Sequence, residues 1–104
     1  MASETKIGSF VGTAAALSVS LGFVPDHIRI VNETDGDAAW EWFKGMTNGH
    51  ALQSNATGDN SKITANGISE YAGNGSNPPG FTVGTALSES GKTFRYVATR
   101  NGEY

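Results

Sequence analysis

Apolar and polar residues alternate along several short segments of the chain. In Leu17–Phe23 one face carries every apolar side chain, and the other face carries Ser18, Ser20 and Gly22. His27–Asn32 and Lys92–Arg100 alternate in the same way, with Ile28 and Ile30 on one face of the former. A period of two residues is typical of half-buried strands. The pattern therefore predicts strands over these three segments.

Three further segments are predicted as strands: Lys6–Val11, Ala38–Phe43 and Phe81–Val83. Residues 45–60 carry few apolar side chains and are expected to form a loop. The Asn66–Gly67 dipeptide, between Ile63 and Ile68, suits a type I′ hairpin turn. The glycine-, asparagine- and proline-rich residues 72–80 predict an exposed loop. Phe81–Val83 and Lys92–Arg100 are expected to pair as a closing hairpin.

Many short strands with no convincing helix favour an all-β fold. We expect a single-domain antiparallel β-sandwich over residues 1–104, with a jelly-roll-like fold or a small barrel as the variant. Residues 1–8 are expected to form an extended N-terminal arm.

Composition narrows the class of protein. The chain has 14 glycines, no cysteine and a formal net charge of −3. Glycine disfavours a helical bundle, and the lack of cysteine excludes disulfide scaffolds and cysteine-based zinc sites. The negative charge argues against binding to nucleic acid. No apolar run reaches the roughly 18 residues of a membrane span, and no signal peptide is predicted.

Residues with possible catalytic chemistry are few and scattered. His27 and His50 have no partner at a diagnostic spacing, and Asp35-Gly36-Asp37 lacks the remaining ligands of a calcium loop. The sequence therefore predicts no catalytic, cofactor or metal site, and no enzymatic activity. An aromatic platform for sugar stacking is the alternative for Trp40, Trp42 and Tyr71. For the two tryptophans, packing in the core is favoured, with Glu41 directed to water.

Two segments carry a resemblance to a known group of proteins. Leu21-Gly22-Phe23-Val24-Pro25-Asp26, with the strand that follows, resembles a signature in structural proteins of tailed bacteriophages. Gly80-Phe81-Thr82-Val83-Gly84, followed by Gly91-Lys92-Thr93-Phe94-Arg95-Tyr96-Val97-Ala98, is similar to the closing hairpin of the same group. The resemblance spans about residues 17 to 100 and implies a non-enzymatic virion protein with a β-sandwich fold.

The resemblance implies a capsid decoration (cement) protein at the virion surface, made in the host cytoplasm. The expected partners are the major capsid protein and copies of the chain itself, with a trimer favoured, and neither nucleic acid nor membrane. The alternative is a receptor- or carbohydrate-binding module of the tail. Contact residues are predicted on the N-terminal segment and on the loop that precedes Phe81, namely Lys6, Phe10, Asn74, Asn77, Pro78 and Pro79.

Overall fold

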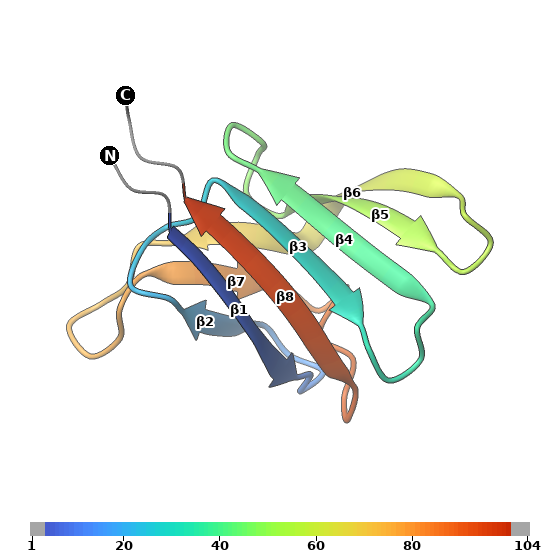
Figure 1. The fold of residues 1–104 in the computed structure, drawn as a ribbon, viewed down its shortest axis with the longest axis horizontal. Coiled ribbons are helices and arrows are strands. Elements are labelled where there is room, and N and C mark those ends of the chain that lie inside the picture. Colours follow the sequence, from blue (N-terminus) through green and yellow to red (C-terminus); the bar gives the residue numbers. More distant parts are fainter. Residues whose placement is uncertain (1–3, 101–104) are drawn as a thin grey trace.

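All regular structure in residues 4–100, the part that the computed structural model describes, is β-strand (Figure 1). The strands are β1 (Glu4–Val11), β2 (Leu17–Ser20), β3 (His27–Asn32), β4 (Ala38–Phe43), β5 (His50–Asn55), β6 (Asn60–Tyr71), β7 (Gly80–Val83) and β8 (Thr93–Arg100). The predicted all-β class is confirmed. Among these residues, no helix is long and apolar enough to span a membrane.

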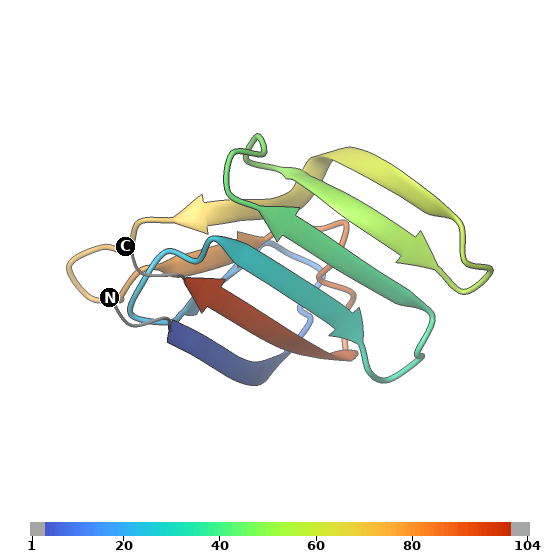
Figure 2. The ribbon, with the colours of Figure 1, turned by 45° about the horizontal axis from the view of Figure 1, so that its top comes forward.

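The eight strands form one antiparallel sheet in the order β1-β8-β3-β4-β5-β6-β7-β2. The sheet curls so that β1, β8, β3 and β4 make one layer and β2, β7 and the end of β6 make the other (Figures 1 and 2). The result is a barrel-like shape that stays open between β1 and β2. The small barrel, named as the variant of the predicted sandwich, is the closer description.

The core fills the space between the two layers. Phe81 of β7 meets Tyr96 of β8 edge to face, with ring centroids 5.3 Å apart. Phe94 of β8 stacks on Phe10 at 5.1 Å and contacts Trp40 at 5.9 Å. The other buried apolar side chains are Leu21, Phe23, Ile28, Ile30, Trp42, Ala51, Ile68, Val83, Leu87 and Ala98. The inward positions of the alternating segments thus form one core.

β6 bends the sheet from one layer to the other. Its first residues pair with β5, and its last four, Ile68–Tyr71, pair with β7. The register shifts at His50/Ala51, so that residues 64–67 of β6 bulge between Ile63 and Ile68. Asn66 takes a positive φ of 59° at this point. The predicted hairpin turn at residues 65–67 is therefore wrong: these residues form a bulge inside one long strand, where Asn66 takes the left-handed conformation and Gly67 lets the Gly49 carbonyl approach closely.

Two other predictions of local structure are wrong. Residues 50–55, which were expected within a loop, form β5. The strand has no apolar alternation to predict it, because Ala51 is its one fully buried residue. The predicted closing hairpin does not form, because β7 pairs with β6 and β2, whereas β8 pairs with β1 and β3. A third predicted strand, Leu17–Phe23, forms but is shorter than expected. It pairs only as far as Ser20, after which the backbone N–H groups of Leu21 and Gly22 donate to the carbonyl of Pro79.

The strand predicted over Lys6–Val11 forms, as part of β1. Of the arm expected over residues 1–8, residues 4–8 belong to β1 and pair with β8. Residues 1–3 of that arm lie outside the described residues.

Candidate functional site

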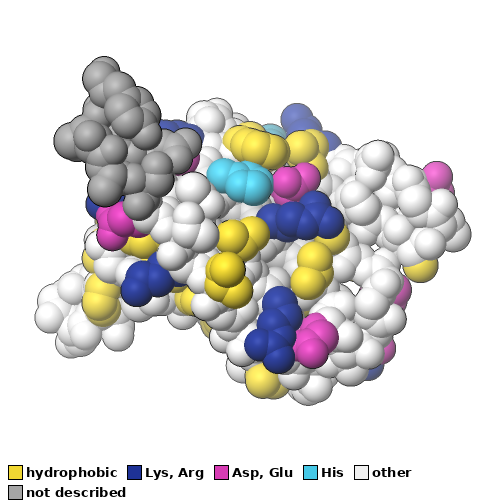
Figure 3. Space-filling model, viewed as in Figure 1, with side chains coloured by type: hydrophobic (Ala, Val, Ile, Leu, Met, Phe, Trp, Pro, Cys, Tyr) yellow, Lys and Arg dark blue, Asp and Glu magenta, His cyan; other side chains and the backbone are white. Residues whose placement is uncertain are grey.

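The outer face of β8, β3, β4 and β5 collects polar and apolar side chains over a broad surface, which we call the open face. The central row across it is Val97–Arg29–Glu41–Leu52, as the register of the four strands fixes. A second row, Arg95–Val31–Ala39–Ser54, lies to one side, and Thr99–His27–Phe43 lies to the other. Figure 3 looks onto this face and shows charged side chains dispersed among apolar ones.

Glu41 is the centre of the charge arrangement on the open face. Its carboxylate lies 3.0 Å from Nε2 of His27 and 3.5 Å from Nη1 of Arg29. The His27 ring also stacks on Phe43, with centroids 4.7 Å apart. The side chains of His27 and Glu41 are each 33% exposed. Glu41 is therefore partly exposed, as predicted, but it is paired with two neighbours across the strand ladder.

Three shallow hollows meet at Arg29 on this face. The first, of about 440 Å³, lies over β4, β5 and the start of β6, and its polar lining includes Glu41, Gln53 and Asn60. The second, of about 410 Å³, extends toward the β3–β4 turn, and the third, of about 200 Å³, lies between β3 and β8. Because Arg29 lines all three, its side chain lies at the centre of a surface to which five strands contribute, namely β3, β4, β5, β6 and β8.

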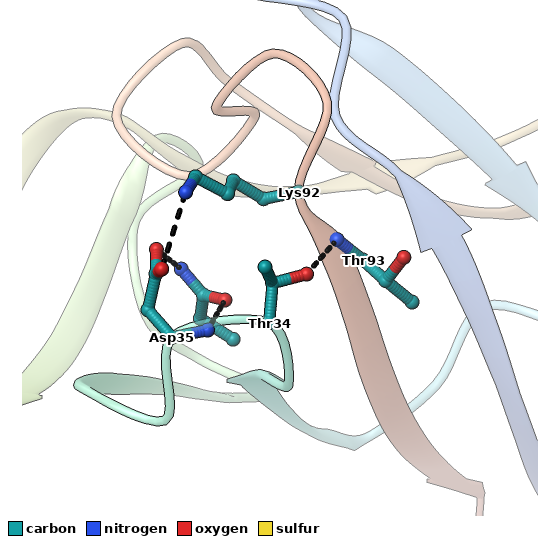
Figure 4. Close-up of polar contacts among 5 residues, drawn as sticks. Thr34, Asp35, Lys92 and Thr93 are labelled. Atoms are coloured by element: carbon teal, nitrogen blue, oxygen red, sulfur yellow. Dashed lines mark hydrogen bonds and ion pairs between the residues drawn. The ribbon is translucent and has the colours of Figure 1, made fainter.

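The Asp35-Gly36-Asp37 segment forms the turn between β3 and β4. The backbone N–H of Asp35 donates to Oδ1 of Asn32 at 3.1 Å, and Lys92 Nζ donates to Asp35 Oδ1 at 3.1 Å. Thr93 donates its backbone N–H to Thr34 Oγ1 at 2.8 Å, so the turn is tied to the start of β8 (Figure 4). These contacts raise the pKa of Lys92, through the hydrogen bond and the charge of Asp35. The turn therefore connects β3 and β4 to the start of β8. The described residues hold no cluster of three or more metal-ligating side chains.

The aromatic residues of the alternative sugar-binding hypothesis lie in different environments. Trp40 is 6% exposed and donates from Nε1 to Gln53 Oε1 at 2.8 Å, and Trp42 is 1% exposed. Both rings pack in the core, so they offer no stacking face to a ligand. Tyr71 is half-buried at the end of β6, where its hydroxyl accepts a hydrogen bond from Asn74.

The predicted contact residues lie on two separate elements. Lys6 is exposed on β1, and Phe10 is half-buried on the same strand against Phe94. Asn74, Asn77, Pro78 and Pro79 lie in the loop between β6 and β7. In that loop the side chain of Asn74 accepts from the backbone N–H groups of Ser76 and Asn77, so it is used within the loop.

The sequence prediction missed the open face as a unit. The signal that leads to it is the alternation in His27–Asn32, which sets the odd-numbered residues of this strand on the face opposite Ile28 and Ile30. The contribution of Leu52 and Ser54 was missed because β5 was expected to be a loop. Exposed apolar side chains now mark this surface: Phe43 and Leu52 are each 43% exposed.

The chain was compared with family models, with curated proteins and with solved structures, and none of the three comparisons found a match.

Proposed function

We propose that the chain is a non-enzymatic virion structural protein, a decoration protein that binds the outer capsid surface through the open face. The observation that carries the proposal is the composition of this face, where the apolar side chains of Phe43, Leu52 and Val97 surround the charged pair Arg29 and Glu41. Interfaces between proteins are enriched in aromatic residues and arginine and combine apolar contact with polar rims. The phage assignment itself rests on the resemblance of the two sequence segments.

The paired charges fit a docking role. Glu41 already has the Arg29 guanidinium and the His27 imidazole as neighbours, so covering it would not leave an isolated carboxylate in a dry interface. In this proposal the shallow hollows around Arg29 receive small side chains of the partner. The partners in this proposal are the major capsid protein and further copies of the chain, at the virion surface. The β6–β7 loop and the β1 residues Lys6 and Phe10 remain predicted contacts.

The test is co-sedimentation of the purified chain with capsids from its source, together with cryo-EM of the decorated particle. The double variant Arg29→Glu/Leu52→Asp places like charge beside Glu41 and removes exposed apolar area. We expect it to weaken capsid binding by about tenfold or more, since loss of a desolvated charge contact costs about 2 kcal/mol or more. The matched control is Glu70→Lys on the exposed surface of β6. Failure of the wild-type chain to sediment with capsids would refute the proposal.

A second candidate function, a carbohydrate- or receptor-binding module of the tail, is favoured by the first hollow. Its lining combines Glu41, Gln53 and Asn60 with hydroxyl groups of Ser54 and Ser61, which are donors and acceptors suited to sugar hydroxyls. Saturable binding of an oligosaccharide in a titration, lost in Asn60→Ala, together with location on the tail in micrographs, would favour this function over decoration.

A further inference from the structure

β1 is an open edge of the sheet. Among the described residues it pairs with β8 alone, along its full length from Glu4 to Val11. Its outward side chains include Ile7, 80% exposed, and Val11, 56% exposed. A long edge strand with exposed apolar residues is a template for pairing with another strand.

The direction of the free backbone groups on β1 follows from the hydrogen bonds of β8. The carbonyls of Thr93 and Thr99 accept from Glu33 and Asp26, which flank β3. The backbone N–H and C=O groups of odd-numbered residues of β8 therefore point toward β3, and those of even-numbered residues point toward β1. Phe94 and Tyr96 are the register partners of Phe10 and Gly8, so the even-numbered residues of β1 bond to β8. The backbone N–H and C=O groups of the odd-numbered residues, from Thr5 to Val11, are consequently directed away from the sheet.

We propose that two copies of the chain pair through this edge, β1 against β1 in antiparallel orientation, with Ser9 opposite Ser9 on a two-fold axis. In this register Ile7 lies opposite Val11 of the second copy, and Val11 lies opposite Ile7. Each of these pairs exchanges backbone hydrogen bonds between residues whose groups are free in the single chain. The sheet then continues from one copy into the other, and the interface is isologous.

Side chains distinguish this register from its neighbours. A two-fold axis at Ile7 would set Glu4 opposite Phe10, and an axis at Gly8 would set Lys6 opposite Phe10. The axis at Ser9 pairs both exposed apolar residues with each other and sets Phe10 opposite Gly8. Gly8 adds no side chain of its own opposite Phe10, and the Tyr96 phenol of the same copy covers its backbone.

Lys6 is compatible with the same arrangement. Charged side chains on the inner face of an edge strand oppose further strand addition. With the axis at Ser9, Lys6 lies beyond the Ile7–Val11 segment, and Gly12 of the second copy is the residue opposite it. Lys6 therefore limits the paired segment to its apolar part and disfavours the register in which the lysine faces Phe10.

The first test is the mass of the full chain in solution, measured by sedimentation velocity from about 1 to about 300 µM, because dimerisation follows mass action. We expect a concentration-dependent dimer. Ser9→Pro removes only an outward N–H, which an edge strand tolerates, and Ile7→Lys introduces charge at the centre of the interface. Each variant should weaken dimerisation by about tenfold or more. Leu52→Lys, an exposed apolar residue on a strand paired at both sides, is the matched control and should leave dimerisation unchanged.

A wild-type chain that stays monomeric, or that forms the trimer favoured from the sequence, would overturn the proposal. So would a dimer that persists unchanged in both β1 variants. Far-UV circular dichroism of each variant checks that the strand content is retained, and a variant that loses it is replaced by Val11→Lys.

The second test addresses the register. The chain has no cysteine, so Ser9→Cys introduces a single thiol. Only a residue on the axis lies opposite itself, at a Cα separation of about 5.5 Å, which a disulfide can span. Mild oxidation should therefore convert Ser9→Cys, but neither Thr5→Cys nor Ile7→Cys, to a covalent dimer. Preferential cross-linking of Ile7→Cys would place the axis elsewhere and contradict the proposed register.

Discussion

Tyr96 joins the two layers of the molecule at the scale of a single residue. Its ring contacts Phe81 across the core and lies 6.5 Å from Phe10 on the edge strand. The backbone of Gly8 passes so close to the phenol that a Cβ at Gly8 would lie 2.7 Å from the Tyr96 hydroxyl oxygen. Burial disfavours the phenolate, and this desolvation raises the pKa of Tyr96.

Tyr96 is therefore expected to make the fold sensitive to alkali. The folded-state pKa is raised above that of the unfolded chain, near 10, so its contribution to stability is complete below about pH 10. As the pH rises further, the unfolded chain loses the proton first and the free energy of unfolding falls. Urea denaturation at increasing alkaline pH should show this fall, and Tyr96→Phe should reduce it. An equal fall in both proteins would contradict the role assigned to Tyr96.

At the scale of elements, the bulge in β6 determines how β6 and the segment after β7 approach each other. Gly84 donates its N–H to the carbonyl of Gly67 at 2.7 Å, and Ala86 donates to that of Asn66 at 3.1 Å. A Cβ on Gly84 would lie 2.6 Å from the Cα of Asn66. The bend that carries the sheet between layers thus depends on a residue without a side chain.

Gly84→Ala should accordingly destabilise the fold. Backbone rather than a flexible side chain opposes the added methyl group, so we expect a loss of about 1–3 kcal/mol in the free energy of unfolding. Urea denaturation measures this loss. Gly75→Ala is the matched control, because a Cβ at Gly75 would have no atom within 4 Å and its effect should stay within about 0.5 kcal/mol. Equal stability of the two variants would show that β6 can move away.

Alternation predicted the elements whose inward positions are apolar. The predicted bounds of β3 and β4 agree with the structure because Ile28, Ile30, Trp40 and Trp42 are all buried. β5 was missed because its pairing depends on backbone bonds to β4 and β6, not on apolar side chains. Local alternation also does not predict which strands pair, since β7 and β8 have similar alternation yet lie in different layers. The same limit applies to the open face. Alternation shows which residues of a strand share a face, but only the order of the strands shows that these residues form one surface.

At the scale of the whole molecule, a connection on the open side of the barrel-like sheet ties the two edge strands to the turn before β8. The residues between β1 and β2 contact this turn, where Thr13 donates its N–H to Ser88 Oγ at 2.9 Å and Ala14 donates to the Ser88 carbonyl at 2.7 Å. Ser88 is fully buried. One serine thus anchors the segment that passes from one edge of the sheet to the other.

Ser88→Ala should weaken this closure. Loss of the hydroxyl leaves the Thr13 N–H without its partner, at a cost of about 1–3 kcal/mol in the free energy of unfolding. Ser90→Ala makes the same chemical change at an exposed position of the same turn and should have little effect. Thermal denaturation followed by circular dichroism compares the two variants. Identical midpoints would show that water replaces the serine hydroxyl.

The pairing of β1 with β8 also has a consequence for how the chain reaches its fold. The ladder joins Glu4 to Arg100, so its formation closes a loop that contains nearly the whole described chain. Each doubling of loop length adds about 0.6 kcal/mol of entropic cost, whereas the β3–β4 hairpin closes over a short turn. We therefore expect the hairpins to form early and β1 to dock last. Until β1 docks, β8 is an edge strand of the sheet. At this stage a newly made chain can most readily exchange β1 with a second copy of the chain.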